Sequence, residues 1–123
     1  GREVLNYGHT MAHAIERFTD YEVRHGEAVA IGCVFVADLA SLHGFLDEEL
    51  VQRHARAFAK VGLPVGFSAA PYADLRSTMA MDKKTRGSQL RFLVLEGLAT
   101  PRVLAGPSEE HLEIAYQRMV ARG

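Results

Sequence analysis

The chain has 123 residues, 48% hydrophobic and 24% charged, which is the composition of one globular domain that folds in water. Its formal charge of −1 argues against a dedicated nucleic-acid binder. The longest apolar run, residues 28–37, is shorter than the roughly 20 residues that span a bilayer. Residues 1–20 mix Arg, Glu and His, unlike a secretory leader, and one cysteine cannot form an internal disulfide. We therefore expect a cytoplasmic protein that binds neither nucleic acid nor membrane.

The first half of the chain predicts two helices separated by a break. Helix-forming residues run from Gly8 to about Phe18, and the pattern breaks at residues 21–24. A longer helix is predicted from about Gly26 to residue 43, with Gly44 as its stop. Because apolar residues cover most sides of this helix, we expect it at the centre of the domain.

Two further helices are predicted between residues 47 and 81. Asp47 is the predicted N-cap of the first, which Gly62 and Pro64 end. Pro71 suits the first position of a short helix that ends near Met81.

The pattern then changes to that of strands. The apolar runs 90–95 and 102–104, separated by Gly97, predict a small hairpin. Ser108 is the predicted cap of a last helix. The expected fold class is mostly α, a multi-helix domain with one small β-hairpin.

Three histidines are the strongest candidates for chemistry. His9 and His13 are four residues apart and share a helix face, which suits a shared metal or one ligand beside an acid/base group. His25 opens the long helix after the break, and a chain reversal there would return it toward His9. With one carboxylate these imidazoles would make a zinc site with an open position. Glu16 and Glu27 are local carboxylates, although a favourable charge at a helix N-terminus explains Glu27 better.

A second polar cluster occupies residues 81–87. Lys83 and Lys84 on a flexible loop there could close over a phosphate or carboxylate, and a solvated turn is the plainer interpretation. Arg2 could bind a carboxylate, and Asn6 could offer its amide to a phosphate or hydroxyl.

The remaining candidates are assigned to packing. Cys33 lies in the apolar helix and is expected to be a small core residue. A structural role is also expected for His43, His54, His111, Tyr72 and Tyr116.

Three motifs in this order resemble those of 3-dehydroquinate synthase. They are Arg-x-x-Leu-Asn-x-Gly-His-Thr-x-x-His-Ala-Ile-Glu, His-Gly-Glu-x-Val-Ala-x-Gly, and Asp-Lys-Lys before the hairpin. The resemblance is to the C-terminal helical domain of that family, covers residues 1–123, and looks most like the actinobacterial branch. Ala12 stands where the family usually has Gly, and Cys33 where Met is commoner, but neither change removes a chemical group.

The resemblance implies a carbon-oxygen lyase of the shikimate pathway of aromatic amino-acid biosynthesis. Such enzymes convert 3-deoxy-D-arabino-heptulosonate 7-phosphate to 3-dehydroquinate and phosphate. NAD oxidises an alcohol transiently, phosphate is eliminated, the ketone is reduced back, and the ring closes by an aldol step. The implied cofactors are NAD and Zn²⁺ or Co²⁺. The implied partners are a sugar-acid phosphate, an N-terminal NAD-binding half that this chain lacks, and a second copy in a homodimer. We expect the chain to be inactive without that half.

Residue by residue, the resemblance makes His9 and His25 the histidine metal ligands. It places the third ligand on a Glu N-terminal to this chain, and so on neither Glu16 nor Glu27. His13 is implied as the catalytic residue that assists proton transfer near the leaving phosphate. The implied substrate-binding residues are Arg2, Asn6, His13 and one lysine of the pair Lys83 and Lys84, with the choice between the two left open.

Two alternatives stay open. A related sugar-phosphate cyclase, such as 2-deoxy-scyllo-inosose synthase, runs the same chemistry on a substrate that lacks the carboxylate expected to meet Arg2. The chain could also be a non-catalytic helical module that uses its apolar helix for subunit contact.

Overall fold

The computed structural model describes residues 8–86, 91–96 and 100–123. Five helices and one two-stranded sheet lie within these ranges. In chain order the elements are α2 (His9–Phe18), α3 (His25–Leu42), α4 (Glu48–Lys60), α5 (Tyr72–Arg86), β1 (Arg91–Glu96), β2 (Thr100–Ala105) and α6 (Glu109–Arg122). The prediction of a mostly helical domain with one small hairpin is confirmed.

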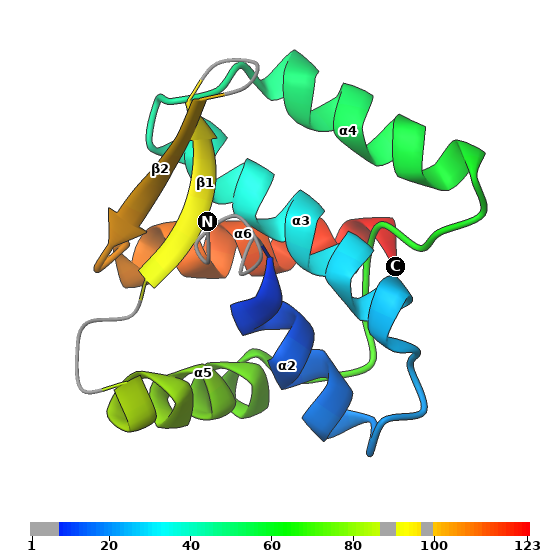
Figure 1. Cartoon of the computed structure of the whole chain (residues 1–123), viewed down its shortest axis with the longest axis vertical. Coiled ribbons are helices and arrows are strands. Elements are labelled where there is room, and N and C mark those ends of the chain that lie inside the picture. The colour runs from blue at the N-terminus through cyan, green and yellow to red at the C-terminus, as the bar shows by residue number, and fades with distance from the viewer. Residues whose placement is uncertain (1–7, 87–90, 97–99) are drawn as a thin grey trace.

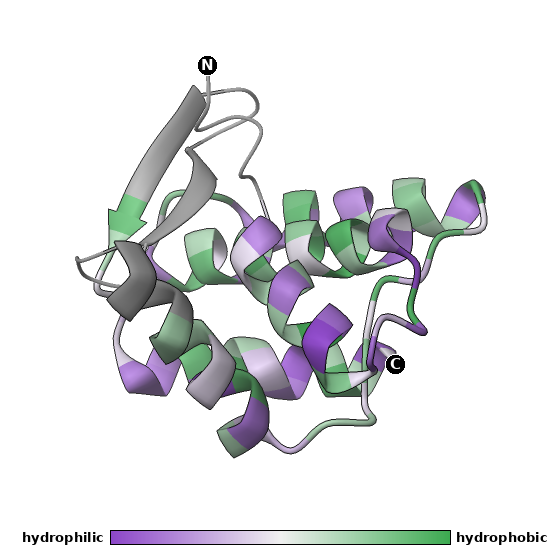
Figure 2. Ribbon diagram, turned by 60° about the horizontal axis from the view of Figure 1, so that its bottom comes forward, coloured by the Kyte–Doolittle hydropathy of each residue, from purple (hydrophilic) through white to green (hydrophobic). Residues whose placement is uncertain are grey.

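Helix α3 is the centre of the domain, as its apolar sides predict (Figure 1). It contacts α2, α4, α6 and β1, and every residue from Ala30 to Ala40 is buried. Its hydropathy and length would suffice to cross a membrane, but 67% of the segment is buried inside the protein. Figure 2 shows hydrophobic and hydrophilic residues interspersed along the helices, and buried hydrophobic residues of all five described helices form one core cluster. We therefore interpret α3 as a core helix.

The other elements surround α3. Helix α2 packs against both α3 and α5. Helices α4 and α5 lie on opposite sides of the domain (Figure 1). Strands β1 and β2 pair antiparallel, with Arg91 opposite Ala105 and Glu96 opposite Thr100. This arrangement places the start of α2 against the middle of α3, and it brings Glu16, near the end of α2, to His25 at the start of α3.

One boundary prediction is wrong. Helix α5 was expected to end near Met81, with a loop over residues 81–87, but the helix continues to Arg86. The continuation is physically reasonable because residues 82–86 contain neither Gly nor Pro, and Lys and Arg are good helix formers. Lys83 and Lys84 therefore sit on the last turns of a helix.

The two predicted N-caps behave differently. Ser108 caps α6 as predicted, because its side-chain oxygen accepts a hydrogen bond from the His111 N–H at 3.1 Å. Asp47 occupies the N-cap position of α4, but its side chain makes no cap hydrogen bond. Asp47 thus contributes only the favourable charge of a carboxylate near a helix N-terminus.

A buried ion pair joins the centre of the domain to its last helix. Asp38 on α3 is 0% exposed, and both of its oxygens accept hydrogen bonds from the guanidinium of Arg122 on α6. Arg118 lies one turn earlier, with Nη1 3.5 Å from Asp38 Oδ1. The two arginines compensate a carboxylate that would otherwise be costly to bury.

Candidate functional site

The site is built on a close contact between α2 and α3. Gly8, which precedes α2, has φ of +74°, a conformation that glycine adopts most readily. A Cβ on Gly8 would lie 2.7 Å from the Cys33 nitrogen, and one on Gly32 would lie 2.1 Å from the Gly8 oxygen. The two backbones approach this closely only because both residues lack a side chain. The contact brings the start of α2 onto the middle of α3.

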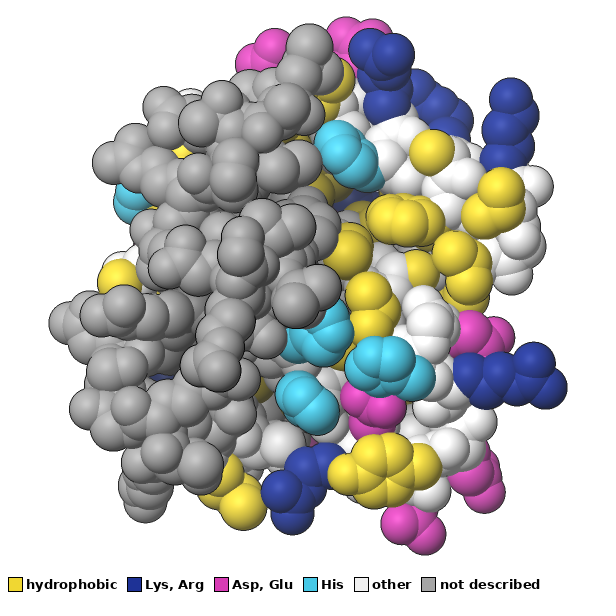
Figure 3. All heavy atoms as spheres, in the orientation of Figure 1, with side chains coloured by type: hydrophobic (Ala, Val, Ile, Leu, Met, Phe, Trp, Pro, Cys, Tyr) yellow, Lys and Arg dark blue, Asp and Glu magenta, His cyan; other side chains and the backbone are white. Residues whose placement is uncertain are grey.

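This contact gathers the three predicted histidines. The ring centre of His9 lies 5.6 Å from that of His25 and 6.4 Å from that of His13. Histidine side chains cluster on this face where α2 and α3 meet (Figure 3). His9 is half-buried, whereas the side chains of His13 and His25 are 52% and 61% exposed. The expectation that a reversal returns His25 toward His9 is confirmed. The reversal uses positive φ at Asp20 and Tyr21.

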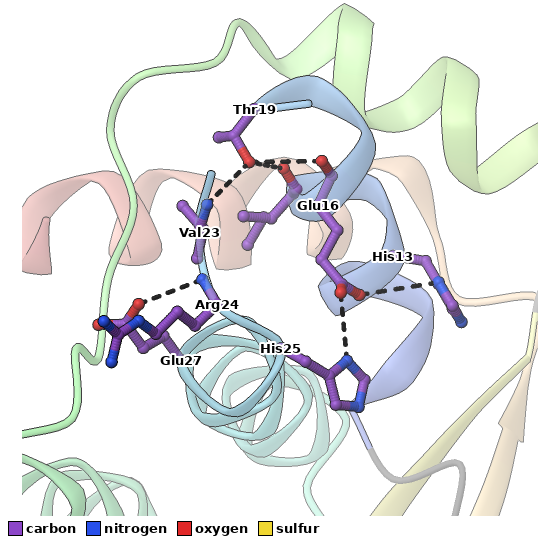
Figure 4. Close-up of polar contacts among 8 residues, drawn as sticks. His13, Glu16, Thr19, Val23, Arg24, His25 and Glu27 are labelled. Atoms are coloured by element: carbon purple, nitrogen blue, oxygen red, sulfur yellow. Dashed lines mark hydrogen bonds and ion pairs between the residues drawn. The ribbon is translucent and has the colours of Figure 1, made fainter. Parts of the chain in front are cut away.

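The Glu16 carboxylate lies between His13 and His25, as Figure 4 shows. His9, His13 and Glu16 fall on one face of α2, at spacings of four and seven residues from His9. Glu16 Oε2 lies 3.2 Å from His25 Nδ1, and Oε1 lies 3.8 Å from His13 Nδ1. Only 6% of Glu16 is exposed, so a single carboxylate is buried between two solvent-facing imidazoles.

Glu27 has the helix-capping role expected of it. Its Oε1 accepts a hydrogen bond from the backbone N–H of Arg24, the N-cap residue of α3 (Figure 4). Glu27 therefore stabilises the helix end on which His25 stands.

The donor set fits two ligands of a zinc site. Two imidazole nitrogens about 2 Å from one tetrahedral zinc place their ring centres roughly 5 Å apart, close to the separation of His9 and His25. The Nδ1 of His25 faces Glu16, which leaves its Nε2 for a metal. No three His, Cys, Asp or Glu side chains within residues 8–86, 91–96 and 100–123 are arranged to hold a metal by themselves. A metal bound here would need a ligand from outside that set.

Four predicted substrate-binding residues cannot be placed. Arg2 and Asn6 lie outside the described residues, and so do the side chains of Lys83 and Lys84. Of the predicted site residues, the structure thus brings together His9, His13 and His25.

Cys33 is a core residue, as predicted. It is buried, and burial raises the pKa of its thiol to about 11. Because the thiolate is the reactive form, this pKa disfavours a nucleophilic role at neutral pH. Ala12, the neighbouring departure from the family pattern, is also buried in the core.

The residues assigned to packing make local contacts. His54 Nδ1 lies 2.8 Å from the carbonyl oxygen of Leu50, and the His43 ring packs edge-on against Phe45. The rings of Tyr72 and Tyr116 pack edge-on, with centres 5.3 Å apart.

Tyr72 also takes part in a polar cluster that sequence reasoning missed. Its hydroxyl donates to Glu109, which Arg76 also binds, so the cluster ties α5 to α6. Burial and the hydrogen bond to Glu109 raise the pKa of Tyr72, and the Arg76 hydrogen bond lowers the pKa of Glu109. The cluster is separate from the histidines and ties helices together.

The contacts of Glu16 with His13 and His25 were also missed. The sequence offered Glu16 only as one of two local carboxylates for a metal site. Its seven-residue spacing from His9 was the available signal, since that spacing places both side chains on one face of α2.

Comparison with known proteins gives one consistent family. The family described as 3-dehydroquinate synthase C-terminal matches residues 1–85. The chain is 55% identical over 116 residues to the 3-dehydroquinate synthase of Thermobifida fusca, covering 94% of this chain and 32% of that protein. The chain therefore spans about a third of the length of this curated relative.

Solved structures share the fold at lower identity. A 2-epi-5-epi-valiolone synthase from Streptomyces hygroscopicus, with NAD⁺ and Zn²⁺ bound, matches with a TM-score of 0.86 and 23% identity, over 96% of this chain and 33% of that one. A 2-deoxy-scyllo-inosose synthase complexed with carbaglucose-6-phosphate, NAD⁺ and Co²⁺ matches with a TM-score of 0.75 and 24% identity, over 91% of this chain and 34% of that one. At these identities the likeness shows the fold alone.

Proposed function

This chain belongs to the 3-dehydroquinate synthase C-terminal family, and from that premise we propose that it forms the metal- and substrate-binding part of a 3-dehydroquinate synthase. The reaction is the conversion of 3-deoxy-D-arabino-heptulosonate 7-phosphate to 3-dehydroquinate and phosphate, with NAD and Zn²⁺ or Co²⁺ as cofactors. The observation that carries the proposal is the 5.6 Å separation of the His9 and His25 rings at the contact between two family motifs.

His9 and His25 are the proposed metal ligands from this chain. They come from two different helices, and the buried Gly8–Gly32 contact holds those helices at a constant separation. A divalent metal at this place would polarise a substrate hydroxyl and ease its oxidation by NAD. The third ligand is a carboxylate from outside this chain, in keeping with the absence of a complete ligand set in the described ranges.

His13 is the proposed catalytic proton carrier. It stands one helical turn from His9, and its side chain is 52% exposed, so a substrate in the site can reach it. Its Nδ1 faces Glu16, and the opposite ring nitrogen is directed away from that carboxylate (Figure 4). This orientation suits proton transfer to or from a substrate placed beside the metal ligands.

The family resemblance assigns binding of the substrate phosphate and carboxylate to cationic side chains and to one amide side chain. Arg2 would bind the carboxylate, and Asn6 and one of Lys83 and Lys84 would bind the phosphate end. The position of the two lysines near the end of α5, which packs against α2, supports this role. The proposed partners are an N-terminal NAD-binding half and a second copy of the protein in a homodimer. The proposed location is the cytoplasm.

The assignment to 3-dehydroquinate synthase is tested by substrate choice. The complete gene product that contains this chain, supplied with NAD and Zn²⁺, is expected to release phosphate from the heptulosonate 7-phosphate and not from glucose 6-phosphate. The 55% identity to a 3-dehydroquinate synthase, against 23–24% to the cyclases, supports this outcome. Release from glucose 6-phosphate alone would assign the protein to the cyclases instead.

The metal ligands are tested separately by zinc binding. Structural zinc sites bind with about 10–16 kcal/mol, so loss of one ligand of four costs roughly 3 kcal/mol, or more than about 100-fold in affinity. His9→Ala and His25→Ala should each show this loss in a competition titration with a chelator. His43→Ala, which changes an exposed histidine just beyond the other end of α3, is the control and should bind zinc normally. Equal zinc affinity in all three variants would contradict the metal site and favour the non-catalytic helical module.

A further inference from the structure

The Glu16 carboxylate is built into the core although both of its partners face solvent. It is 6% exposed, and its two oxygens are directed at the Nδ1 atoms of His25 and His13 (Figure 4). Burying a carboxylate is costly unless partners compensate it. A residue that only stabilised the fold would be expected to have mostly buried partners, as Asp38 does, since the side chains of Arg122 and Arg118 are 14% and 32% exposed. The position of Glu16 thus indicates that its contacts with the two histidines serve function and not only the stability of the fold.

The contact with His25 determines which ring nitrogen is available. A carboxylate oxygen accepts hydrogen bonds, so the Nδ1 of His25, 3.2 Å from Glu16 Oε2, carries the proton. The proton on Nδ1 leaves a lone pair on Nε2. A histidine that binds a metal commonly donates its other N–H to a carboxylate, which determines the tautomer and the ring orientation.

The second oxygen of Glu16 is incompletely satisfied. Oε1 is buried and has no hydrogen-bond partner among the described residues, and His13 Nδ1 lies 3.8 Å from it. His13 is exposed, so a small rotation of its side chain would bring Nδ1 within hydrogen-bond distance. Buried polar atoms are rarely left without a partner, and His13 is the partner that the geometry offers.

We propose that Glu16 is a positioning residue that holds His25 and His13 together, each with its proton on Nδ1. Nε2 of His25 would then be available to a metal, and Nε2 of His13 would be available to the substrate. One carboxylate thereby couples the metal ligand on α3 to the proton carrier on α2. This inference rests on the proposed function, since it assigns Glu16 through the roles of the two histidines.

Glu27 provides the matched comparison. It is a glutamate on the same pair of helices, two residues from His25, but its Oε1 accepts a hydrogen bond from the backbone N–H of Arg24, and it binds no histidine of the described residues. Its capping of α3 makes it a structural residue. Changing each glutamate to glutamine therefore separates positioning of the histidines from the general effect of losing a carboxylate.

Zinc affinity of the complete gene product is the first test. A glutamine can accept one hydrogen bond from a histidine through its oxygen, but its NH₂ group cannot accept a second. Glu16→Gln should therefore bind zinc about 10–100-fold more weakly, the loss typical of residues that orient metal ligands. Glu27→Gln should bind zinc within about twofold of the unchanged protein. Equal affinities in the two variants would overturn the proposal.

The protonated ring nitrogen is the second test, and it needs neither metal nor activity. Side-chain ¹⁵N chemical shifts of His25 and His13 in the metal-free, unchanged protein report which nitrogen carries the proton. Both histidines are expected to carry it on Nδ1. A proton on Nε2 of His25 would overturn the proposal even if Glu16→Gln failed to fold.

The two tests separate this inference from the proposed function. If His9→Ala and His25→Ala lose zinc while Glu16→Gln keeps it, the metal site stands and the positioning role of Glu16 is overturned. If His9→Ala and His25→Ala keep zinc, the proposed function itself fails. In that case Nδ1 protonation of both histidines would still support the hydrogen bonding of Glu16.

Discussion

Two buried carboxylates lie along helix α3, and their binding partners differ in charge and exposure. Toward its C-terminal end, Asp38 of α3 is 0% exposed and accepts hydrogen bonds from Arg122 on both oxygens, with Arg118 close by. At its N-terminal end, Glu16 of α2 meets two exposed histidines, and one carboxylate oxygen has no hydrogen-bond partner in the described part of the chain.

This difference distinguishes a carboxylate that stabilises the fold from one that supports the candidate site. A carboxylate enclosed by permanent cations holds two helices together, and nothing remains for a ligand to complete. A carboxylate beneath exposed imidazoles leaves the outer nitrogens of those rings available to a ligand. The same chemical group is thus structural at one place and a candidate support for chemistry at the other.

The largest difference in the free energy of unfolding is expected when each carboxylate is changed to its amide. Asp38→Asn removes the charge that compensates two arginines in a buried pair and should cost about 3 kcal/mol of the free energy of unfolding. Glu16→Gln should cost less than about 1 kcal/mol, because its partners are exposed histidines. Urea unfolding followed by circular dichroism measures both. A larger loss at Glu16 than at Asp38 would contradict the division.

The contact beneath the histidine site should be almost as sensitive. In Gly32→Ala the new Cβ would lie 2.1 Å from the Gly8 oxygen, so α2 must move away from α3. Overpacking of this kind costs about 1–3 kcal/mol. Zinc affinity should fall as well, since the move separates His9 from His25. Gly26→Ala is the control, because a Cβ there meets nothing within 4 Å. Zinc binding that survives in Gly32→Ala would show that the contact does not position the histidines.

A smaller effect is expected at the helix caps, which lie away from both carboxylates. Ser108→Ala loses a side-chain hydrogen bond to the His111 N–H and should lower stability by about 1 kcal/mol. Asp47→Ala loses no such bond, so its effect should be a few tenths of a kcal/mol. Thermal unfolding of the two variants side by side gives the ranking. Equal losses would mean that Asp47 forms a cap hydrogen bond in solution.

The smallest effect at neutral pH is expected from Cys33. Its pKa of about 11 in the folded protein lies above the ordinary thiol value of 9, so the folded state holds the proton more tightly. This contribution to stability is complete below pH 9 and is lost as the pH rises toward 11. Cys33→Ala should show a weaker fall in stability than the unchanged protein over that range. If the stability of Cys33→Ala and of the unchanged protein fell equally with pH, that result would contradict the burial of the thiol.

Much of the site was predictable because its signals are local. The four-residue spacing of His9 and His13 follows from helix periodicity alone, and the break before His25 predicts a reversal. The family motifs added the roles. Whether Arg2, Asn6, Lys83 and Lys84 contact substrate stays a prediction, since the structure does not describe their side chains.

The end of α5 was harder to predict because charged residues suit both loops and helices. The run after Met81 resembles a solvated turn in composition, yet it lacks a helix breaker until Gly87. Helix propensity differs by only a few tenths of a kcal/mol among such residues, so local preference is too weak to place the boundary.

The sequence by itself therefore determined the helices, the hairpin, the family and the histidine motif, because each depends on residues close together in the chain. Only the tertiary structure decided that Asp38 meets Arg122, 84 residues away, and that Glu16 lies buried between His13 and His25. Those pairings depend on how α3 packs against α6 and α2. Side-chain burial and long-range contact arise from packing, which no local pattern encodes.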